Sequence, residues 1–571
     1  MPFDGLTATY LATEMKTLIG AKVDRVHQPH KDMIILQLRL QRENLKLLIS
    51  ANAVNARINL TNNQYKNPMQ PPLFCMVMRK HLEGCKIKDI LQSPMERSFC
   101  LVFSGTDELG RATEKLLYVE IMGKHSNIIL TTSEGVILDG IKRYTHEVSR
   151  HRQILPGEDY IAPPEQEKKN LTLLTQENFA LLLFEALSAK KLTNTLTEVF
   201  LGLSSQTAKE LLARADLSED LRGEEIGEYE LIRLWQAWQQ IHPHNEATPC
   251  LLKLNGIEND YFPYEPLFIE AEKVHFPSLS EAIDAYFAAK EERSKFTVIK
   301  AELIKVIHGY SDKAQKKLAL QEADFITAED ASKYKIYGEI ITANLWQLPE
   351  RAEELTLDNF YDNNKITIPL DKEINVAANA QRYFKKYNKA KQTLHYLSTQ
   401  IEETKRELSY LTEVDTSLEL SENVDDLQEI RRELELGGYL KSKEPSKKKK
   451  DLLKSEPYLF ISPEGFNIYV GKNNLQNDRL TMKFAQDEDI WLHTKDIPGS
   501  HVIIRSEGKE VPFETIIYAA ELAANYSKAR LGSQVPVDYT GVKNVKKPNG
   551  AKPGYVIYDK QKTVYVTPYI K

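Results

Sequence analysis

The feature that most constrains the fold is a series of residues spaced alternately three and four positions apart. The series consists of Tyr387, Ala390, Leu394, Leu397, Ile401, Thr404, Leu408 and Leu411. This spacing forms the a/d seam of a helix and predicts a coiled coil. A second seam runs through Phe296, Ile299, Leu303, Val306 and Tyr310. Two seams in one chain predict an antiparallel helical hairpin, and dimerisation through the seams is the alternative.

The hairpin predicts a long arm at residues 285–435, with an insert at about 325–375 forming its tip. The insert contains Trp346, Pro349 and the strand-like stretch KITIPL. Roughly 40 helical residues at ~1.5 Å each extend an arm by roughly 60 Å. A small head on such an arm predicts contact with a distant partner.

Two further regions precede the arm. Residues 1–165 combine strand-like stretches with a helix at 74–82 that follows two prolines, which predicts an α+β domain. Residues 170–280 are expected to form a helical domain containing a helix-hairpin-helix at 193–215. Its Gly-Leu-Ser turn at 202–204 supplies a serine that is suited to cap the second helix. Ordinary helical packing is the alternative for this stretch.

A linker and a last domain follow the arm. Residues 436–456 are expected to be a basic linker, because they contain a glycine pair, prolines and the run Lys447–Lys450. Residues 457–571 are expected to form a small α/β domain. A chain of 571 residues is long enough for several cores. The predicted fold class is therefore an α+β multidomain protein.

The charge is distributed unevenly along the chain. The net charge of -6 divides into +4 for residues 1–160, -17 for residues 161–440 and +7 for residues 441–571. Basic ends suit a polyanionic partner such as a nucleic acid. The alternative is that acidic faces of the helical arm alone account for the negative charge of the middle of the chain.

The composition also limits the class of protein. The four cysteines show no CxxC spacing, which argues against a zinc ribbon or a disulfide scaffold. The N-terminus has no secretory leader, and no apolar run approaches the ~18 residues of a membrane span. We therefore expect a soluble cytoplasmic protein without a membrane partner.

The stretch DIWLHTKDIPGSHVIIR at 489–505 concentrates the residue types of a functional site. Its alternation predicts a hairpin, with a type II turn at Pro498-Gly499, that brings several side chains onto one common surface. Those side chains are Trp491, His493, Lys495, His501 and Arg505, with Ser500 as a hydroxyl donor. Aromatic, hydroxyl and basic groups together favour RNA binding.

Two other interpretations of this stretch are weaker. A zinc site needs a third protein ligand, and no third His or Cys lies nearby in the sequence. A pair of general bases lacks a nucleophile other than Ser500. Structural histidines remain the main alternative to an RNA-binding surface. We therefore predict no metal, no cofactor and no catalytic residue here.

Several separate motifs resemble those of the NFACT (RqcH/NEMF) family, which includes the fibronectin-binding protein A-like proteins. In the N-terminal half the matches are FDGL (3–6), VHQP (26–29), PPLFCMVMRKHLEG (71–84), Glu96-Arg97 and EIMGKHSNIIL (120–130). In the C-terminal half they are the stretch at 489–505 and KKPNGAKPGYVIY (546–558). The motifs occur in the family's order, so the resemblance covers almost the whole chain.

The resemblance implies a factor in ribosome-associated quality control that is not an enzyme. Such factors bind large ribosomal subunits near the stalk base while stalled peptidyl-tRNA is still present. They recruit tRNA, alanyl-tRNA in bacteria, for untemplated C-terminal tailing, and the peptide bond is made by the ribosome. Binding to fibronectin is implied as a secondary role. The expected location is the cytoplasm, in association with ribosomes.

The resemblance also implies which side chains contact RNA. Glu96-Arg97 matches the family's Asp-Arg pair with one methylene more, which leaves the exact contact of Glu96 open, and Glu120-Ile121-Met122 matches without change. The full set expected to bind tRNA or other RNA is Asp4, Arg79, Glu96, Arg97, Glu120, Ile121, Met122, Lys124, His125, Trp491, His493, Lys495, Ser500, His501, Arg505, Lys546, Lys547 and Lys552. From the sequence alone, Glu96 and Arg97 form no more than a surface ion pair.

Two other functions are weighed against this one. An α+β domain followed by a helix-hairpin-helix also resembles formamidopyrimidine-DNA glycosylases, and removal of Met1 would expose the secondary amine of Pro2 as a nucleophile. Phe3 in place of a glutamate and the lack of a C-terminal zinc finger argue against that enzyme. The other alternative is a surface adhesin that binds fibronectin.

Overall fold

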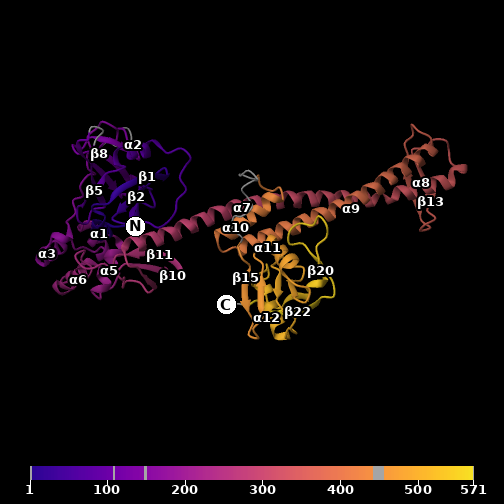
Figure 1. Cartoon of the computed structure of the whole chain (residues 1–571). Coiled ribbons are helices and arrows are strands. Elements are labelled where there is room, and N and C mark those ends of the chain that lie inside the picture. Colours follow the sequence, from indigo (N-terminus) through magenta and orange to yellow (C-terminus); the bar gives the residue numbers. More distant parts are fainter. Residues whose placement is uncertain (1–2, 107–109, 147–150, 442–454, 570–571) are drawn as a thin grey trace. The chain divides into compact units, whose positions relative to one another are not determined.

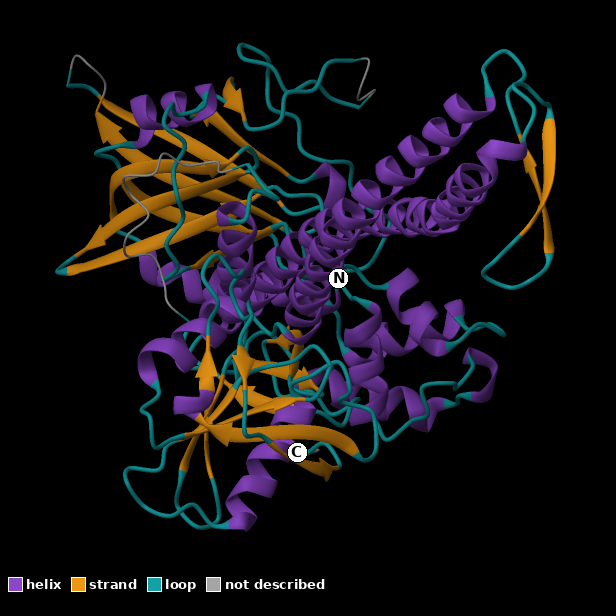
Figure 2. Ribbon diagram, turned by 90° about the vertical axis from the view of Figure 1, so that its right-hand side faces the viewer, coloured by secondary structure: helices purple, strands orange, loops and turns teal. Residues whose placement is uncertain are grey.

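The computed structural model describes residues 3–106, 110–146, 151–441 and 455–569. The chain divides into two compact units, Met1–Arg293 and Ser294–Lys571 (Figure 1). Pro2 and the Lys447–Lys450 run lie outside the described residues. The protein is a mixed α/β multidomain chain with several sheets and long helices (Figure 2).

Unit 1 is built on a nine-stranded antiparallel sheet. Across the sheet its strands are β4 (Arg57–Leu60), β3 (Glu43–Ser50), β2 (Met33–Leu40), β1 (Lys22–His30), β5 (Lys86–Gln92), β6 (Ser98–Thr106), β7 (Ala112–Glu120), β8 (Asn127–Thr132) and β9 (Ile137–Gly140). Helices α1 (Gly5–Met15) and α2 (Leu73–Leu82) share one large apolar core with the sheet. The helix expected at 74–82 is thus present as α2, next to a sheet formed by the strand-like stretches.

The second part of unit 1 is mainly helical. It contains α3 (Gln176–Ala186), α4 (Leu192–Val199), α5 (Ser205–Arg214), α6 (Glu228–Gln240) and a small sheet of β10 (Cys250–Leu254), β11 (Ile257–Phe262) and β12 (Glu272–His275). Ser204 caps α5 by accepting from the Thr207 amide, as the sequence predicts. Gly202 has φ +72, and a Cβ there would lie 2.2 Å from the Met95 oxygen. The turn between α4 and α5 therefore packs closely against the loop before β6.

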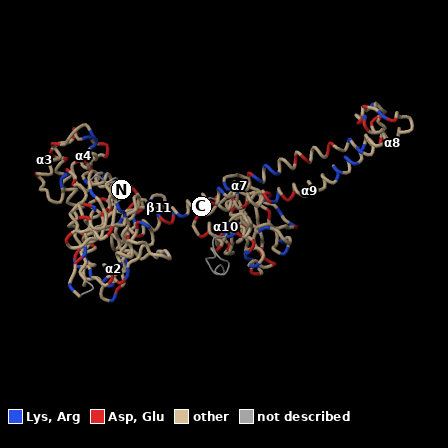
Figure 3. Tube along the Cα trace, turned by 90° about the horizontal axis from the view of Figure 1, so that it is seen from above, with Lys and Arg blue, Asp and Glu red and all other residues tan. Residues whose placement is uncertain are grey.

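Long helices dominate the first part of unit 2. Helix α7 (Leu279–Glu329) begins in unit 1, and α9 (Val376–Leu420) and α10 (Val424–Leu436) follow. Lys300 Nζ donates to the Glu419 oxygen at 3.2 Å, and Thr404 Oγ1 bonds Gln321 Oε1 at 3.0 Å. The two long helices therefore run antiparallel. Positions of Lys or Arg and positions of Asp or Glu are interspersed along both helices (Figure 3).

A small group of elements connects α7 to α9. It contains α8 (Lys333–Asn344), β13 (Glu354–Asp358) and β14 (Lys365–Pro369). Ile340, Ile341, Leu355 and Ile368 pack with Val376 at the start of α9. The strand-like stretch KITIPL forms β14, which pairs with β13.

The C-terminal domain contains a six-stranded antiparallel sheet. Across it lie β15 (Tyr458–Ile461), β16 (Asn467–Val470), β18 (Val502–Ile504), β17 (Ile490–Thr494), β19 (Val535–Gly541) and β22 (Lys562–Val566). Helix α12 (Phe513–Asn525) packs on one face. The other face is covered by the π-helical turn Leu480–Phe484, which follows α11 (Asn474–Arg479), and by the segment with β20 (Val545–Lys546) and β21 (Ile557–Tyr558).

Candidate nucleic-acid interface

The Glu96-Arg97 and Glu120-Ile121-Met122 motifs lie side by side. Glu96 and Arg97 occupy the connection between β5 and β6, and Ser98 pairs with Glu120 in the sheet. The Ile121 amide donates to the Arg97 oxygen at 2.9 Å. This bond extends the β6–β7 ladder by one step. Two motifs separated by more than twenty residues in the sequence thus form one edge of the sheet.

The backbone before Arg97 is held in an unusual conformation. Met95 is buried and has φ +67, a conformation that most L residues avoid. Its amide donates to Thr9 Oγ1 at 2.8 Å, and Gln92 Nε2 donates to the Glu96 oxygen at 2.7 Å. Helix α1 and β5 therefore fix the direction in which Glu96 and Arg97 leave the sheet.

Glu96 and Arg97 are both half-buried at this edge. Burial raises the pKa of Glu96, whereas the neighbouring Arg97 guanidinium opposes that rise. Glu165 adds a smaller upward contribution to the same pKa. The Glu96 carboxylate thus interacts electrostatically with the guanidinium of Arg97, its neighbour in the sequence.

Glu120 is completely buried and binds within the protein. Its carboxylate accepts two bonds from Arg152, at 2.7 and 2.5 Å, and one from Tyr160 Oη at 2.9 Å. Ile121 is buried as well. Direct contact of the Glu120 carboxylate with RNA would require breaking a buried ion pair. In this structure Glu120 anchors residues 152–161 to the sheet.

The residues that follow Glu120 and Ile121 turn outward. Met122 is half-buried, and its amide donates to Ser126 Oγ at 2.8 Å. Lys124 and His125 lie on the 3-10 turn Gly123–His125 and are exposed. The motif therefore has a buried beginning and an exposed basic end.

Asp4 binds the helix-hairpin-helix. It caps α1 by accepting from the Thr7 amide at 2.9 Å. Its other oxygen accepts from Ser204 Oγ at 2.7 Å and from Thr207 Oγ1 at 2.5 Å. Asp4 is buried, and all these bonds lie within unit 1. The carboxylate joins the N-terminal ends of α1 and α5.

Arg79 lies on α2, where it contacts strand β1. Its Nε donates to the Val26 oxygen at 2.9 Å, and Glu83 Oε1 accepts from the Val26 amide at 2.9 Å. About a third of the Arg79 side chain is exposed. Part of the Arg79 side chain is therefore accessible next to the VHQP stretch.

In the C-terminal domain, the predicted register is correct but the predicted open surface is not. Trp491 pairs with Ile503, so Trp491, His493 and His501 share one face of β17 and β18. That face is covered, because Trp491 packs among Leu480, Val545 and Tyr558. Trp491 is fully buried, and Ser500 and His501 are buried too. The covering segment at 545–558 is the second NFACT motif of this domain.

The turn between β17 and β18 also differs from the expected type II turn. Asp496 has a positive φ, whereas Gly499 does not. Gly499 instead forms a bridge with Ser527, and a Cβ at Gly499 would lie 2.8 Å from the Ser527 Cβ. Gly499 is required here because the backbone approaches the end of α12 closely. The residue of the turn with a left-handed backbone conformation is Asp496.

The two histidines are packed against each other and against Trp491. Their rings lie 5.5 Å apart, and His501 Nδ1 bonds Thr481 Oγ1 at 2.7 Å. Burial lowers the pKa of both imidazoles, so both are neutral at pH 7. Across the described part of the chain, no three His, Cys, Asp or Glu side chains gather as a metal site.

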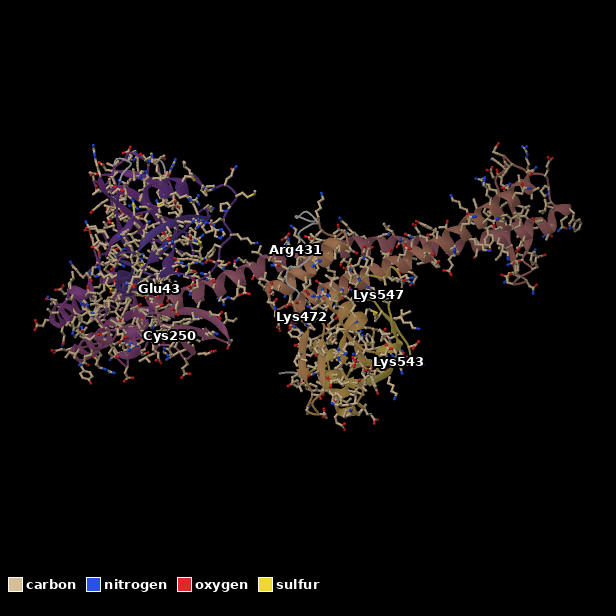
Figure 4. The ribbon with its side chains drawn as sticks, in the orientation of Figure 1. Glu43, Cys250, Arg431, Lys472, Lys543 and Lys547 are labelled. Atoms are coloured by element: carbon tan, nitrogen blue, oxygen red, sulfur yellow. The ribbon has the colours of Figure 1, made fainter. Side chains whose placement is uncertain are left out.

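The basic residues of this domain differ in accessibility. Lys495 and Lys546 are exposed. Arg505 pairs with the buried Asp489 at 3.1 Å, and Lys547, labelled in Figure 4, pairs with Asp478. Lys552 bonds Tyr439 Oη and lies 4.4 Å from the Tyr410 ring centroid. Among the basic residues predicted in this domain, the lysines at 495 and 546 are therefore the exposed ones.

The partners of these residues could not be found from the sequence. Arg152 and Tyr160 lie 32 and 40 positions from Glu120, in a stretch without a periodic pattern. The buried face of α10 was missed as well. Glu429 there accepts from Asn473 and Gln476, and Lys472, which is labelled in Figure 4, pairs with Asp426. These contacts join α10 to α11, and no local signal in the sequence indicates them.

Two family models match consecutive parts of the chain. The model for NFACT N-terminal and middle domains matches residues 4–452, and the model for the NFACT protein RNA binding domain matches residues 456–559. The chain is 38% identical over 574 residues to the Rqc2 homolog RqcH of Bacillus subtilis, covering 100% of this chain and 98% of that protein.

Solved structures match each half. The N-terminal part of the fibronectin/fibrinogen-binding protein of Streptococcus suis is 32% identical and covers 50% of this chain and 99% of its own, with a TM-score of 0.42. The C-terminal part of that protein is 37% identical and covers 48% of this chain and 96% of its own, with a TM-score of 0.38. Within the described residues, no helix is long and apolar enough to cross a membrane.

Proposed function

Because the chain belongs to the NFACT family, we propose that it is a ribosome quality control factor that holds tRNA on obstructed large ribosomal subunits. It binds subunits that carry stalled peptidyl-tRNA and recruits alanyl-tRNA for untemplated C-terminal tailing. The observation that carries this proposal is the 38% identity to an RqcH protein over the entire chain. The match to an RNA-binding domain supports the choice of partner.

In this proposal the protein contributes binding and not bond formation. The ribosome makes each peptide bond, and this chain positions the tRNA that supplies the next residue. Proximity and orientation alone lower the barrier of a reaction between two bound groups substantially. The proposed role therefore requires surfaces that hold RNA in a fixed orientation, and it requires no catalytic side chain.

The sheet edge at Arg97 and Ile121 is the proposed tRNA-binding edge of unit 1. Arg97, Lys124 and His125 supply donors for phosphate oxygens or base edges. Glu96 orients the Arg97 guanidinium through its charge. Asp4, Glu120 and Ile121 act indirectly, because buried anchors keep the edge in one conformation.

The C-terminal domain is proposed to contact RNA through its accessible lysines. Lys495 and Lys546 are exposed, and Arg505 is half-buried. Trp491, Ser500 and His501 are buried beneath that surface, and the half-buried His493 packs against Trp491 and His501. This revises the prediction of stacking on Trp491, because a base cannot reach a fully buried indole.

The antiparallel pair of α7 and α9 is proposed to be the coiled-coil arm of the family. Its elements α8, β13 and β14 form the tip that contacts the large subunit near the stalk base. The support is the match of residues 4–452 to the NFACT N-terminal and middle domains, together with the two heptad seams. The proposed location is the cytoplasm, in association with ribosomes.

The test is co-sedimentation and tailing in cells that lack the chromosomal gene. The chain should sediment with free large subunits and restore alanine tails on a stalled reporter. Sedimentation only with intact translating ribosomes, without tails, would contradict the proposal. Fibronectin binding as a secondary role stays a separate prediction, checked by surface plasmon resonance with the purified chain.

A further inference from the structure

Two NFACT motifs meet at one cavity of unit 1. VHQP (26–29) lies at the end of β1, and PPLFCMVMRKHLEG (71–84) contains α2. The cavity has a volume of about 280 Å³. Its lining includes Gln28, Lys31, Leu73, Phe74, Asp139 and Arg143.

Helix α2 begins at this cavity, and no side chain of the described residues caps its first turn. It spans ten residues, Leu73–Leu82, and Pro72 at the N-cap has no side chain that can accept from them. The first N–H groups of a helix have no partner within the helix and carry partial positive charge. Such a helix end favours a phosphate or another anion.

The charged side chains around the cavity also favour an anion. Lys31 is exposed in the turn between β1 and β2. Arg143 Nε and Nη2 bond the two oxygens of Asp139 at 2.9 and 3.0 Å, which leaves Arg143 Nη1 outside that pair. Asp139 is buried and neutralised by this contact. The remaining local charge is positive.

Gln28 supplies an independent sign of a ligand. Only 4% of this residue is exposed, and its Nε2 donates to the Lys31 oxygen at 3.1 Å. Within the described residues, its Oε1 has no hydrogen-bond partner. Buried acceptors are normally paired, so this oxygen suits a donor supplied from the cavity. A ligand for this cavity therefore needs an anionic group and a hydroxyl or amine donor.

We propose that this cavity binds one nucleotide of an RNA chain. The phosphate lies at the N-terminus of α2 between Lys31 and Arg143, and the ribose 2′-hydroxyl donates to Gln28 Oε1. The volume lies near the lower end for ligand pockets, about 300 Å³, which suits a single nucleotide. The proposal rests on the proposed function and names an additional RNA contact within it.

The helix amide is tested with a matched pair of substitutions at one position. Leu73→Pro removes an N–H at the first helical position, where proline is well tolerated, and Leu73→Ala keeps it. Leu73 is exposed, so neither change opens the core. With the full chain and an octauridine ribonucleotide, we expect Leu73→Pro to bind about fivefold more weakly than Leu73→Ala, as for one lost hydrogen bond.

The lysine is tested by the salt dependence of the same binding. Lys31→Gln should reduce the slope of log affinity against log salt by about 0.7, the effect of one lost phosphate contact on a single strand. Lys22→Gln, at the other end of β1, is the control and should leave the slope unchanged. A 4-thiouridine version of the octamer should crosslink to peptides from residues 26–34 and 72–80.

The glutamine is tested by sugar preference. Gln28→Met keeps the shape of the side chain and removes the acceptor. The natural chain should prefer the ribo-octamer to the deoxyribo-octamer, and Gln28→Met should bind both equally. Competition by uridine 5′-monophosphate as strong as that of the octamer would assign the cavity to a free nucleotide and overturn the RNA assignment.

The proposal is overturned if Leu73→Pro binds like Leu73→Ala and Lys31→Gln binds like Lys22→Gln. In that case the natural chain would still bind large subunits, so the proposed function would stand. Failure of the natural chain to bind large subunits or tRNA would instead contradict the proposed function. The two failures are therefore distinguishable.

Discussion

The amide of Ile121 donates to the backbone oxygen of Arg97 at 2.9 Å, which joins two sequence motifs into one edge of the N-terminal sheet. The contact is between backbone atoms, so it does not depend on the side chain at either position. The Glu120 side chain beside this bond is held by Arg152. The edge thus combines a rigid backbone with a basic side chain at its rim.

The first prediction concerns the geometry of the Glu96-Arg97 pair. Arg97→Lys should fail in alanine tailing although it keeps the charge, because lysine cannot form a planar two-pronged contact. Glu96→Asp should tail normally, and the double change Glu96→Ala with Arg97→Ala should abolish tailing while large-subunit binding persists. Tail length on a stalled reporter is the measurement. Arg39→Lys, on an exposed ion pair, is the control.

Normal tailing by Arg97→Lys would mean that the pair supplies only charge. Normal tailing by the double alanine variant would remove the motif from the proposed tRNA-binding edge altogether.

The second prediction concerns Glu120 as a buried anchor. Glu120→Gln leaves the buried Arg152 without a charged partner, which should cost about 3–5 kcal/mol of local stability. Thermal unfolding and limited proteolysis near residues 152–161 should detect the loss. Glu114→Gln breaks only the exposed pair with Lys88 and should change the melting temperature little. Equal melting temperatures for the two variants would contradict the anchoring role.

The third prediction concerns pH and the junction of α9 with α10. Burial raises the pKa of Glu413 to about 7, with a further contribution from Glu433, and burial raises the pKa of Glu433 to about 7. A carboxyl group whose pKa is higher in the folded state than in the unfolded state stabilises the fold. This contribution is complete at pH values below the pKa of the unfolded state, which is 4.5 here. That contribution disappears as the pH rises through 7.

We therefore expect the free energy of unfolding of unit 2 to fall by about 1–3 kcal/mol between pH 4.5 and pH 8. Pulse proteolysis in urea measures it. Glu433→Gln should flatten this dependence, whereas Glu419→Gln, at an exposed position of α9, should not. An unchanged slope in Glu433→Gln would show that the dependence arises elsewhere.

The fourth prediction concerns the tip of the arm. Deletion of residues 325–375 should weaken large-subunit binding while tRNA binding by the purified chain persists. The deletion removes most of the apolar cluster around Ile340 and Ile368, so Val376→Ser and Tyr383→Ser should accompany it to keep the start of α9 soluble. Sedimentation of the shortened chain with large subunits at the natural level would contradict the role of the tip.

The fifth prediction concerns the two histidines of the C-terminal domain. The double change His493→Ala with His501→Ala should weaken RNA binding through loss of packing on Trp491, without any change in metal content. Elemental analysis and tryptophan fluorescence are the measurements. Stoichiometric zinc in the natural chain, lost on the double change, would make this a metal site.

Features with a local physical cause were predictable from the sequence. The 3-4 spacing marks the buried side of α9, because Leu397, Ile401, Thr404 and Leu411 are all buried. The cap at Ser204 and the helix after Pro72 follow from the chemistry of single residues. The sequence also predicts that Trp491, His493 and His501 share one face of the sheet, because successive side chains of a strand point to opposite faces.

Features that depend on distant segments were not predictable. Trp491 appeared accessible because alternation says which residues share a face and not what covers that face. Its cover comes from Leu480 and from Val545 and Tyr558, which are more than fifty positions beyond it. The family resemblance assigned Glu120 to RNA binding, whereas its buried partner Arg152 lies 32 positions away in the sequence. In both cases burial by remote residues decided the outcome.

The most direct test of the central claim is to purify large subunits through a tagged version of this chain and to sequence the tRNA bound to them. The account predicts alanyl-tRNA enriched over its cellular share, peptidyl-tRNA on the same particles and alanine at the C-terminus of the nascent chains. Large subunits with tRNA in its ordinary cellular proportions and nascent chains without added alanine would contradict it.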